Sequence, residues 1–235
     1  MVVEAWFLKG EKLAVVHRVV PRSVAVLRAA LEQLLAGPTA ADTSYGLGTT
    51  VPDGTRLLGV TVEGDTATID LTSTFESGGG SLSMMARMAQ LVFTATQFPN
   101  VERVELWLDG EPVGWIGGEG LIVVPPQTRR DYDGMSGAIV VDGPGVGDEV
   151  SSPLRVTGEA NVFEAVVDLE LRDGAGNVIL HTTTMATAGT GTWGTYEVTL
   201  RFTAPPGPLE LEVYATSPKD GSRIEQVVYP LQGRG

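Results

Sequence analysis

The periodicity of apolar residues changes once along this 235-residue chain, and that change limits the folds open to it. In the first half, strand-like alternation is interrupted twice by apolar residues at spacings of three and four, which indicate helices. From residue 138 onward no helical period occurs, and short β-branched or aromatic runs recur between turn residues. We therefore expect an α+β domain followed by an all-β domain, and 43% hydrophobic residues are enough for two packed cores.

Two helices are predicted in the first half. The first starts near Pro21, which suits an initial turn, and ends at Gly37-Pro38. Its apolar face consists of Val24, Leu27, Leu31, Leu34 and Leu35. The second follows a glycine run and is capped by Ser81 or Ser83. Its apolar stripe consists of Met84, Met88, Leu91 and Ala95, with Met85 and Val92 beside it, and this spacing favours core packing over an adaptable methionine-lined binding surface.

Strands surround these helices. Residues 4–8 and 13–20 form a predicted hairpin, residues 57–62 and 66–71 form a second one, and residues 101–108 form a further strand. An element with one apolar face must bury that face against another layer. The first domain, residues 1–113, is therefore expected to be a two-layer α+β structure in which one sheet carries both helices on one face.

Residues 114–134 are rich in glycine and proline and are predicted to be an ordered but irregular connector. Residues 135–235 then form the second domain. Its seven expected strands are residues 138–141, 154–160, 166–172, 178–184, 196–202, 209–216 and 224–229. Seven short strands favour a small immunoglobulin-like β-sandwich.

Charge and composition exclude several classes of function. A formal net charge of -13 argues against nucleic-acid partners, which need clustered Lys and Arg, and against an anionic membrane surface. The absence of cysteine rules out disulfides and thiolate chemistry. No apolar run reaches the ~18 residues of a membrane span. We expect membrane attachment only through a native leader or anchor that this chain lacks.

The segment TVPDGTRLLGVTVEGDTATIDLTSTF, residues 50–75, follows VLRAALEQLLAGPT and precedes the glycine run and second helix. Together they resemble the GerMN domain of bacterial sporulation and spore germination proteins. The segment VDGPGVGDEVSSPLRVTGEANVFEAVVDLELRDGAG and the strands after it resemble the immunoglobulin-like domain of bacterial spore germination. The tandem covers nearly the whole chain, and its order is more specific than either motif alone.

This resemblance implies an extracytoplasmic, envelope-associated protein, secreted or held by a lipoprotein anchor, that acts through protein contacts or scaffold assembly. It also implies that the chain is not an enzyme, because the family offers no catalytic residues to carry over. The partner is then an envelope protein or a second copy of the chain. Two alternatives stay open: a protein that binds cell-wall glycan or peptide, such as peptidoglycan, and an enzyme with an unidentified site.

Several local motifs invite a chemical interpretation. GTGTWG at residues 189–194 matches a dinucleotide fingerprint, but its flanks are strand-like, whereas a nucleotide cradle must open a helix. His17 and His181 are the only histidines, one in each domain, and no nucleophile elbow accompanies them. Carboxylates in 131–134 with Asp142 and Asp148 could offer oxygens to calcium, but the closing glutamate of an EF-hand is missing. We predict no catalytic residue, no cofactor and no metal ligand.

Trp115 in the glycine-rich connector and Trp193 at a strand connection are the candidate surface-contact residues. Aromatic side chains outside regular core positions are enriched in interaction hot spots. In the alternative glycan-binding function they would be stacking surfaces. They would equally serve to cover the junction between the two domains.

Overall fold

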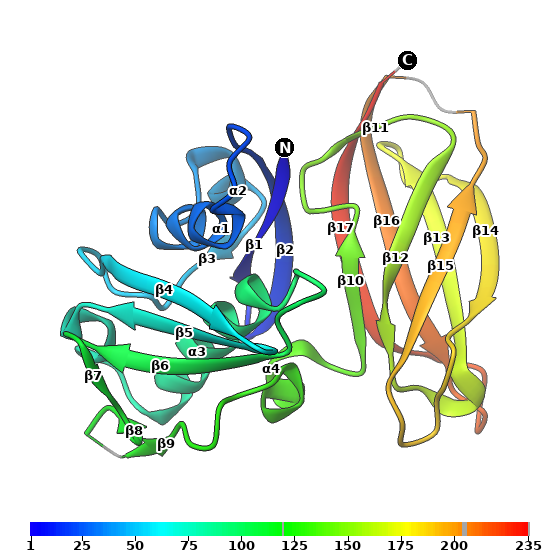
Figure 1. The fold of residues 1–235 in the computed structure, drawn as a ribbon. Helices are drawn as coiled ribbons and strands as arrows, with labels where there is room; N and C mark the ends of the chain where they lie inside the picture. The colour runs from blue at the N-terminus through cyan, green and yellow to red at the C-terminus, as the bar shows by residue number, and fades with distance from the viewer. Residues whose placement is uncertain (119, 204–205, 235) are drawn as a thin grey trace. The chain divides into compact units, whose positions relative to one another are not determined.

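The computed structural model describes residues 1–118, 120–203 and 206–234 (Figure 1). The chain forms two compact units. One comprises Met1–Leu13 and His17–Met135, and the other comprises Ala14–Val16 and Ser136–Gly235. The first is α+β and the second is built of strands, so both predicted fold classes are confirmed.

The described strands of the first unit form two larger sheets and a separate two-stranded hairpin, where a single sheet was predicted. A three-stranded sheet of order β2-β1-β3 consists of β1 (Val2–Lys9), β2 (Lys12–Val19) and β3 (Leu47–Gly48). A four-stranded sheet of order β4-β5-β6-β7 consists of β4 (Leu57–Glu63), β5 (Thr66–Leu71), β6 (Arg103–Leu108) and β7 (Glu111–Pro112). The predicted pairing of β4 with β5 is confirmed, and β5 pairs with β6 in parallel.

The helices are α1 (Val26–Leu35), α2 (Ala40–Ser44) and α3 (Ser81–Ala95), with a 3-10 turn, η1 (Ser73–Glu76), before α3. The predicted start of α1 at Pro21 is wrong. Ser23 Oγ accepts a hydrogen bond from Ala25 N at 3.0 Å, and this local turn competes with the helix. Val24 therefore lies outside α1 and is fully exposed, whereas Leu27, Leu31 and Leu34 are buried as predicted.

The apolar stripe of α3 lies in the core as predicted, but its N-cap does not follow the prediction. The N-cap is Gly80, which has no side chain to offer. Ser83 Oγ instead accepts a hydrogen bond from Arg87 Nη2 at 3.2 Å. Arg87 itself is buried, as are Gln90 and Thr94, so α3 is covered on its polar side as well as its apolar side.

These polar side chains explain why β1 does not pair with a strand of the four-stranded sheet. The N–H of Glu4 in β1 donates to Gln97 Oε1 at 2.7 Å, and Gln97 Nε2 donates to Glu4 O at 2.9 Å. The N–H of Trp6 donates to Thr94 Oγ1 at 3.1 Å, and Gln90 Nε2 donates to Trp6 O at 3.0 Å. Gln90 and Thr94 of α3, and Gln97 just after it, thus bond the backbone groups of β1 that a strand of the four-stranded sheet would otherwise pair with.

Residues 114–134, predicted to be a separate connector, lie in the first unit. They contain β8 (Trp115–Ile116) and β9 (Leu121–Ile122), which pair as a hairpin, and the turns η2 (Arg129–Tyr132) and α4 (Asp133–Ser136). Asp131 accepts hydrogen bonds from the backbone and side chain of Thr128 at 2.7 and 2.8 Å. Asp133 lies 3.4 Å from Arg130. The two carboxylates in residues 131–134, which the sequence offered only as an incomplete calcium motif, thus have partners within the same turn.

The second unit contains all seven predicted strands and one short addition, β11. One sheet, of order β10-β12-β15, consists of β10 (Ile139–Gly143), β12 (Leu154–Ala160) and β15 (Gly194–Leu200). The other, of order β11-β17-β16-β13-β14, consists of β11 (Glu149–Val150), β17 (Arg223–Gly233), β16 (Gly207–Thr216), β13 (Val166–Asp173) and β14 (Val178–Met185), with a 3-10 turn, η3 (Phe163–Ala165), before β13. Alternate residues such as Val167, Leu169 and Leu171 fill the core between the sheets.

The contact between α3 and β1 makes a stability prediction. Thr94→Val keeps the side-chain shape but leaves the buried N–H of Trp6 without its acceptor, so we expect the first unit to lose about 1–3 kcal/mol of unfolding free energy. Urea unfolding of the whole chain, followed by fluorescence, measures this. The control Thr61→Val changes an exposed position on β4 and should cost under about 0.5 kcal/mol. Equal stability of the two variants would contradict the proposed role of Thr94.

Candidate functional site

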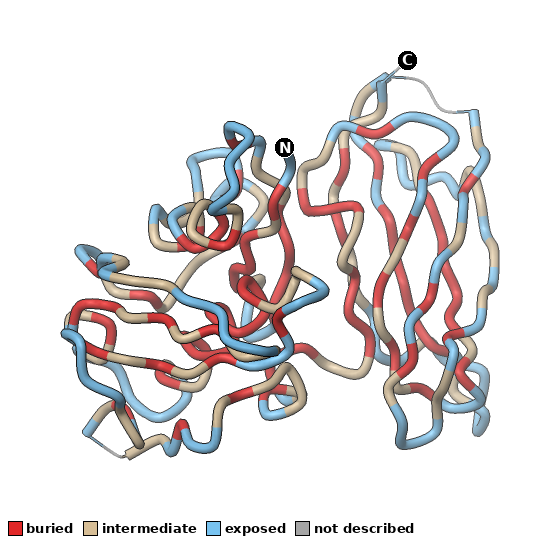
Figure 2. The backbone as a smooth tube through the Cα atoms, viewed as in Figure 1, coloured by how far each residue is buried: buried red, intermediate tan, exposed pale blue. Residues whose placement is uncertain are grey.

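Strand β4 is an edge strand of the four-stranded sheet and has no fully buried residue. Figure 2 shows it mostly exposed or intermediate where its neighbour β5 alternates with buried positions. Ala67 and Ile69 on β5 are fully buried, but Leu58 and Val62 on β4 are 47% and 39% exposed. The prediction that both strands cover a core with one apolar face holds in full for β5. On β4, Val60 on that face is half-buried and α1 contacts the strand, but Val62 is exposed because the sheet ends there.

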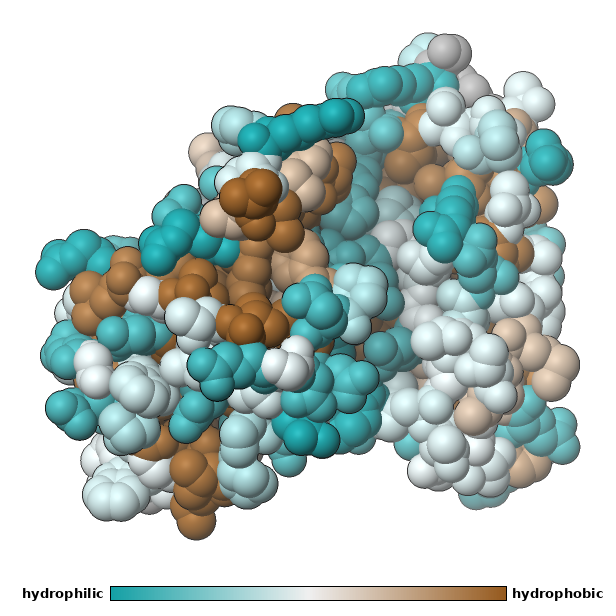
Figure 3. Space-filling model, in the orientation of Figure 1, coloured by the Kyte–Doolittle hydropathy of each residue, from teal (hydrophilic) through white to brown (hydrophobic). Residues whose placement is uncertain are grey.

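A groove runs along this edge. It has a volume of about 260 Å³ and lies between β4, the start of α1 and the segment from Phe98 to Val101. Its lining residues are Val24, Ala25, Val26, Leu27, Arg28, Val60, Thr61, Val62, Phe98, Asn100 and Val101. The space-filling view shows hydrophobic residues gathered over the region of α1 and β4 (Figure 3). An apolar groove beside an unpaired strand edge can hold the side chains of an added strand while its backbone pairs with β4.

The two tryptophans singled out from the sequence lie in different units. Trp115 is in the β8–β9 hairpin of the first unit, opposite Ile122, and both side chains are 67% exposed. Gly117, at a φ of +72°, lets this hairpin lie against Met84, because a Cβ there would be 2.8 Å from Met84 Cγ. Trp193 is half-buried in the connection between β14 and β15. Trp115 and Ile122 thus form a small exposed apolar surface. Trp193 exposes less of its ring because it is half-buried.

The glycines around Trp193 have a packing explanation. A Cβ on Gly189 would lie 2.6 Å from Ala165 N, and one on Gly194 would lie 2.2 Å from Ala188 N. The segment leads into β15, so it has no helix N-terminus to cradle a phosphate.

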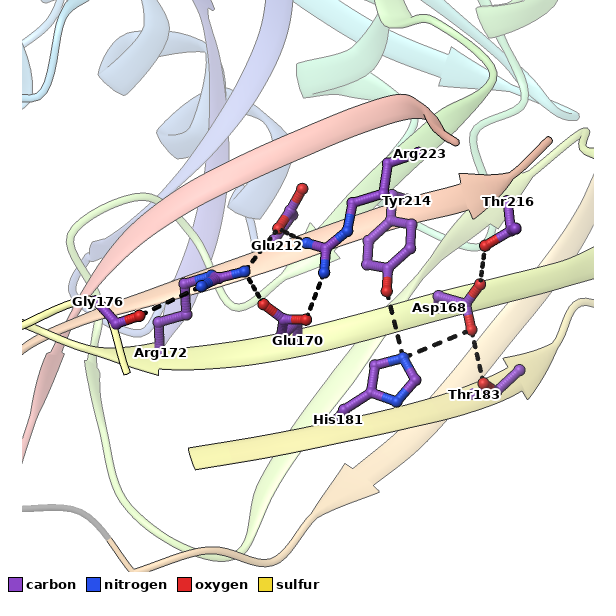
Figure 4. Close-up of polar contacts among 10 residues, drawn as sticks. All are labelled: Asp168, Glu170, Arg172, Gly176, His181, Thr183, Glu212, Tyr214, Thr216 and Arg223. Atoms are coloured by element: carbon purple, nitrogen blue, oxygen red, sulfur yellow. Dashed lines mark hydrogen bonds and ion pairs between the residues drawn. The ribbon is translucent and has the colours of Figure 1, made fainter. Parts of the chain in front are cut away.

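A charged cluster on β13, β14, β16 and β17 was missed by the sequence analysis (Figure 4). Glu170 and Glu212 are buried side by side on paired strands, at opposed positions in the register. Arg223 donates to Glu170 at 2.6 Å and also to Glu212, and its guanidinium lies 4.3 Å from the ring of Tyr214. The hydrogen bond to Glu170 raises the pKa of Arg223. Arg172 pairs with Glu170 from the other side.

Beside this pair, Asp168 is buried and accepts hydrogen bonds from Thr183 at 2.6 Å and from Thr216 at 2.8 Å (Figure 4). His181 Nε2 lies 3.2 Å from the hydroxyl of Tyr214 and 3.9 Å from Asp168 Oδ1. Burial raises the pKa of Tyr214, which keeps the phenol protonated. Every acid of this cluster therefore has donors from the protein itself, as expected of a structural network rather than an open ligand set.

One pattern in the sequence could have signalled the cluster. Asp168, Glu170 and Arg172 alternate with buried apolar residues in β13, and Glu212 and Tyr214 alternate in the same way in β16. Charges at a spacing of two on central strands share one face of the sheet. His17 lies in β2 of the first unit, so the structure places the two histidines in separate units. Across the described ranges, no three His, Asp or Glu side chains are grouped to hold a metal ion.

Comparison with known families identifies both units. An α+β unit followed by a sandwich of strands defines a two-domain chain. Residues 6–114 match the family model described as "Sporulation and spore germination", and residues 138–222 match the model described as "Immunoglobulin-like domain of bacterial spore germination". The first unit is therefore a domain of the sporulation and spore germination family, and the second is a domain of the germination-type immunoglobulin-like family.

Solved structures are also similar to parts of the chain. The first GerMN domain of the sporulation protein GerM from Bacillus subtilis is 20% identical, with a TM-score of 0.48 and coverage of 56% of this chain and 99% of that one. The tandem GerMN domains of the same protein are 13% identical, with a TM-score of 0.48 and coverage of 78% and 59%. A putative lipoprotein from Clostridium perfringens is 20% identical, with a TM-score of 0.43 and coverage of 58% and 92%. The comparison with curated proteins found no match.

Neither family description names a catalytic activity. The helices found in 1–118, 120–203 and 206–234 are all too short or too polar to cross a bilayer.

The charged cluster makes a second stability prediction. Arg223→Ala leaves Glu170 and Glu212 buried with less positive charge, so we expect the second unit to lose about 2–4 kcal/mol. Arg155→Ala removes an equally close pair with Glu197 in which both side chains are exposed, and it should cost far less stability because solvent screens the pair. Urea unfolding of both variants measures the difference. Equal losses would show that the cluster stabilises no more than a surface ion pair.

Proposed function

We propose that this chain is a non-enzymatic, extracytoplasmic envelope protein of the sporulation and spore germination type, and that it acts by binding another protein at the β4 groove. The observation that carries this proposal is the combination of an unpaired strand edge with exposed Leu58 and Val62 beside an apolar groove. Soluble proteins usually protect such an edge with Lys, Pro or a bulge that twists it away. In β4 the register against β5 shifts only between Leu57 and Gly59, and residues 60–63 pair regularly with β5. Membership of two germination families supports the envelope setting.

The side chains of the charged cluster and of the groove support a function in binding another protein. The buried acids of the second unit are already hydrogen-bonded by the protein, and the groove of the first unit is lined mainly by aliphatic side chains. Such a lining binds apolar side chains and offers little acid–base chemistry. A fully exposed Val24 on the groove wall gives a partner a hydrophobic contact without disturbing the fold.

Site-specific photo-crosslinking in cells that make the chain tests the contact. A photoreactive residue in place of Val24 should give a discrete protein adduct, because this position lies at the groove and is fully exposed. The control position Glu111 lies on β7, the opposite edge of the same sheet, and should give none. Adding Val62→Lys should reduce the Val24 adduct about tenfold or more, since a buried unpaired charge costs well over 1 kcal/mol.

Two outcomes would contradict the proposal. One is the same adduct pattern at Val24 and Glu111, which would mean that the groove is not the contact surface. The other is recovery of the protein in the cytosolic fraction when it is made from its own gene at its natural level, which would exclude the envelope setting.

The exposure of Trp115 supports a second candidate, binding of cell-wall glycan or peptide. Sugar rings and peptide side chains stack on exposed aromatic faces, and Ile122 widens this surface. We expect the chain to co-sediment with insoluble peptidoglycan and Trp115→Ala to remove most of the bound fraction. Trp193→Ala, at the half-buried tryptophan of the other unit, is the matched control and should bind normally. No sedimentation of the wild-type chain would exclude this candidate.

A further inference from the structure

We infer that the β4 edge binds a second copy of this chain, with the two β4 strands pairing in antiparallel fashion about a two-fold axis normal to the sheet. This inference rests on the protein-contact function proposed above and names the partner. The backbone of β4 pairs on one side with β5, and its other side faces no strand among those the structure describes. Unpaired N–H and C=O groups along a strand are the template for adding another strand.

The charges at the two ends of β4 select the partner. Arg56, directly before β4, and Glu63, its last residue, are both exposed, and the residues between them carry no charge. In an antiparallel pair the start of one strand meets the end of the other. Glu63 of the second copy therefore lies near Arg56 of the first, and Arg56 of the second copy lies near Glu63 of the first. The favourable charge contact thus occurs twice. A parallel copy would instead place like charges together.

The apolar groove fits the same arrangement. Val60 and Val62 lie opposite Ile69 and Ala67 of β5, so they share the face that is buried by the helices. A two-fold axis normal to the sheet keeps that face of both copies on the same side. The two grooves then open next to each other, and Val24 and Val62 of each copy contribute to one continuous apolar surface. This contact is closed, so it gives a dimer and not a filament or a ring.

A charge-swap series tests the inference with the full chain. Sedimentation equilibrium up to about 1 mM should show a monomer–dimer transition for the wild type. Arg56→Glu creates two like-charge contacts and should raise the dimer Kd about tenfold. Adding Glu63→Arg to that variant reverses both ends of the strand and should restore the Kd to within about threefold of the wild type. Restoration by the second swap is expected only if the two positions face each other across copies.

A crosslinking experiment provides the independent readout. The chain has no cysteine, so Thr61→Cys places a single thiol at the middle of the exposed edge. A short bismaleimide should convert this variant to a covalent dimer. Glu111→Cys, on the edge strand at the other side of the sheet, should stay monomeric.

A monomer at all concentrations, assemblies larger than a dimer, or Kd values unaffected by the swaps would each overturn the inference. These outcomes are distinct from failure of the proposed function. A Val24 adduct with a different protein, together with a monomeric wild type, would support contact at the groove and exclude the second copy as its occupant.

Discussion

The hydrogen bonds between α3 and the edge of β1 are the constraint on which the first unit depends. A buried backbone N–H or C=O must find a partner, and Gln90, Thr94 and Gln97 supply partners where a strand would otherwise do so. Because these side chains recur every three or four residues, one helical row can follow one strand edge. The helix is then buried on its polar as well as its apolar side, and the remaining strands have to form a sheet of their own.

Arg87 fixes the entry to the same helix. Its guanidinium donates to the carbonyl oxygens of Thr50, Phe75, Ser77 and Gly78 at 2.7 to 2.9 Å. Burial lowers the pKa of this arginine, yet a guanidinium stays charged at any physiological pH. Carbonyl dipoles therefore hold a buried cation and tie the loop before α3 to the loop before β4. The sheet that ends in β4 is thus positioned through the same helix that occupies the edge of β1.

Elements with one apolar face could be predicted from the sequence, since their periodicity depends on local geometry alone. The seven strands of the second unit, the β4–β5 hairpin and the buried stripe from Met84 to Ala95 follow this rule. Partners of polar side chains could not be predicted, because Gln90 and Thr94 meet Trp6 across 80 or more residues. The exposed edge at β4 could not be predicted either. Apolar and polar residues alternate along β4 in the same way whether or not another element covers its apolar face. Trp115 was expected at the surface from its glycine-rich context, whereas Val24 was assigned to a helix that starts two residues later.

The edges of the two units differ in a way that bears on the candidate site. In the second unit the edge strand β14 carries His181 and a run of threonines, polar side chains that weaken adhesion to a flat partner. In the first unit one edge of β1 is occupied by a helix. Strand β4 is contacted by α1 and has a register shift between Leu57 and Gly59, but it carries no charged side chain between Arg56 and Glu63. An apolar edge that is left uncovered while other edges are protected is the arrangement expected where a partner supplies the missing cover.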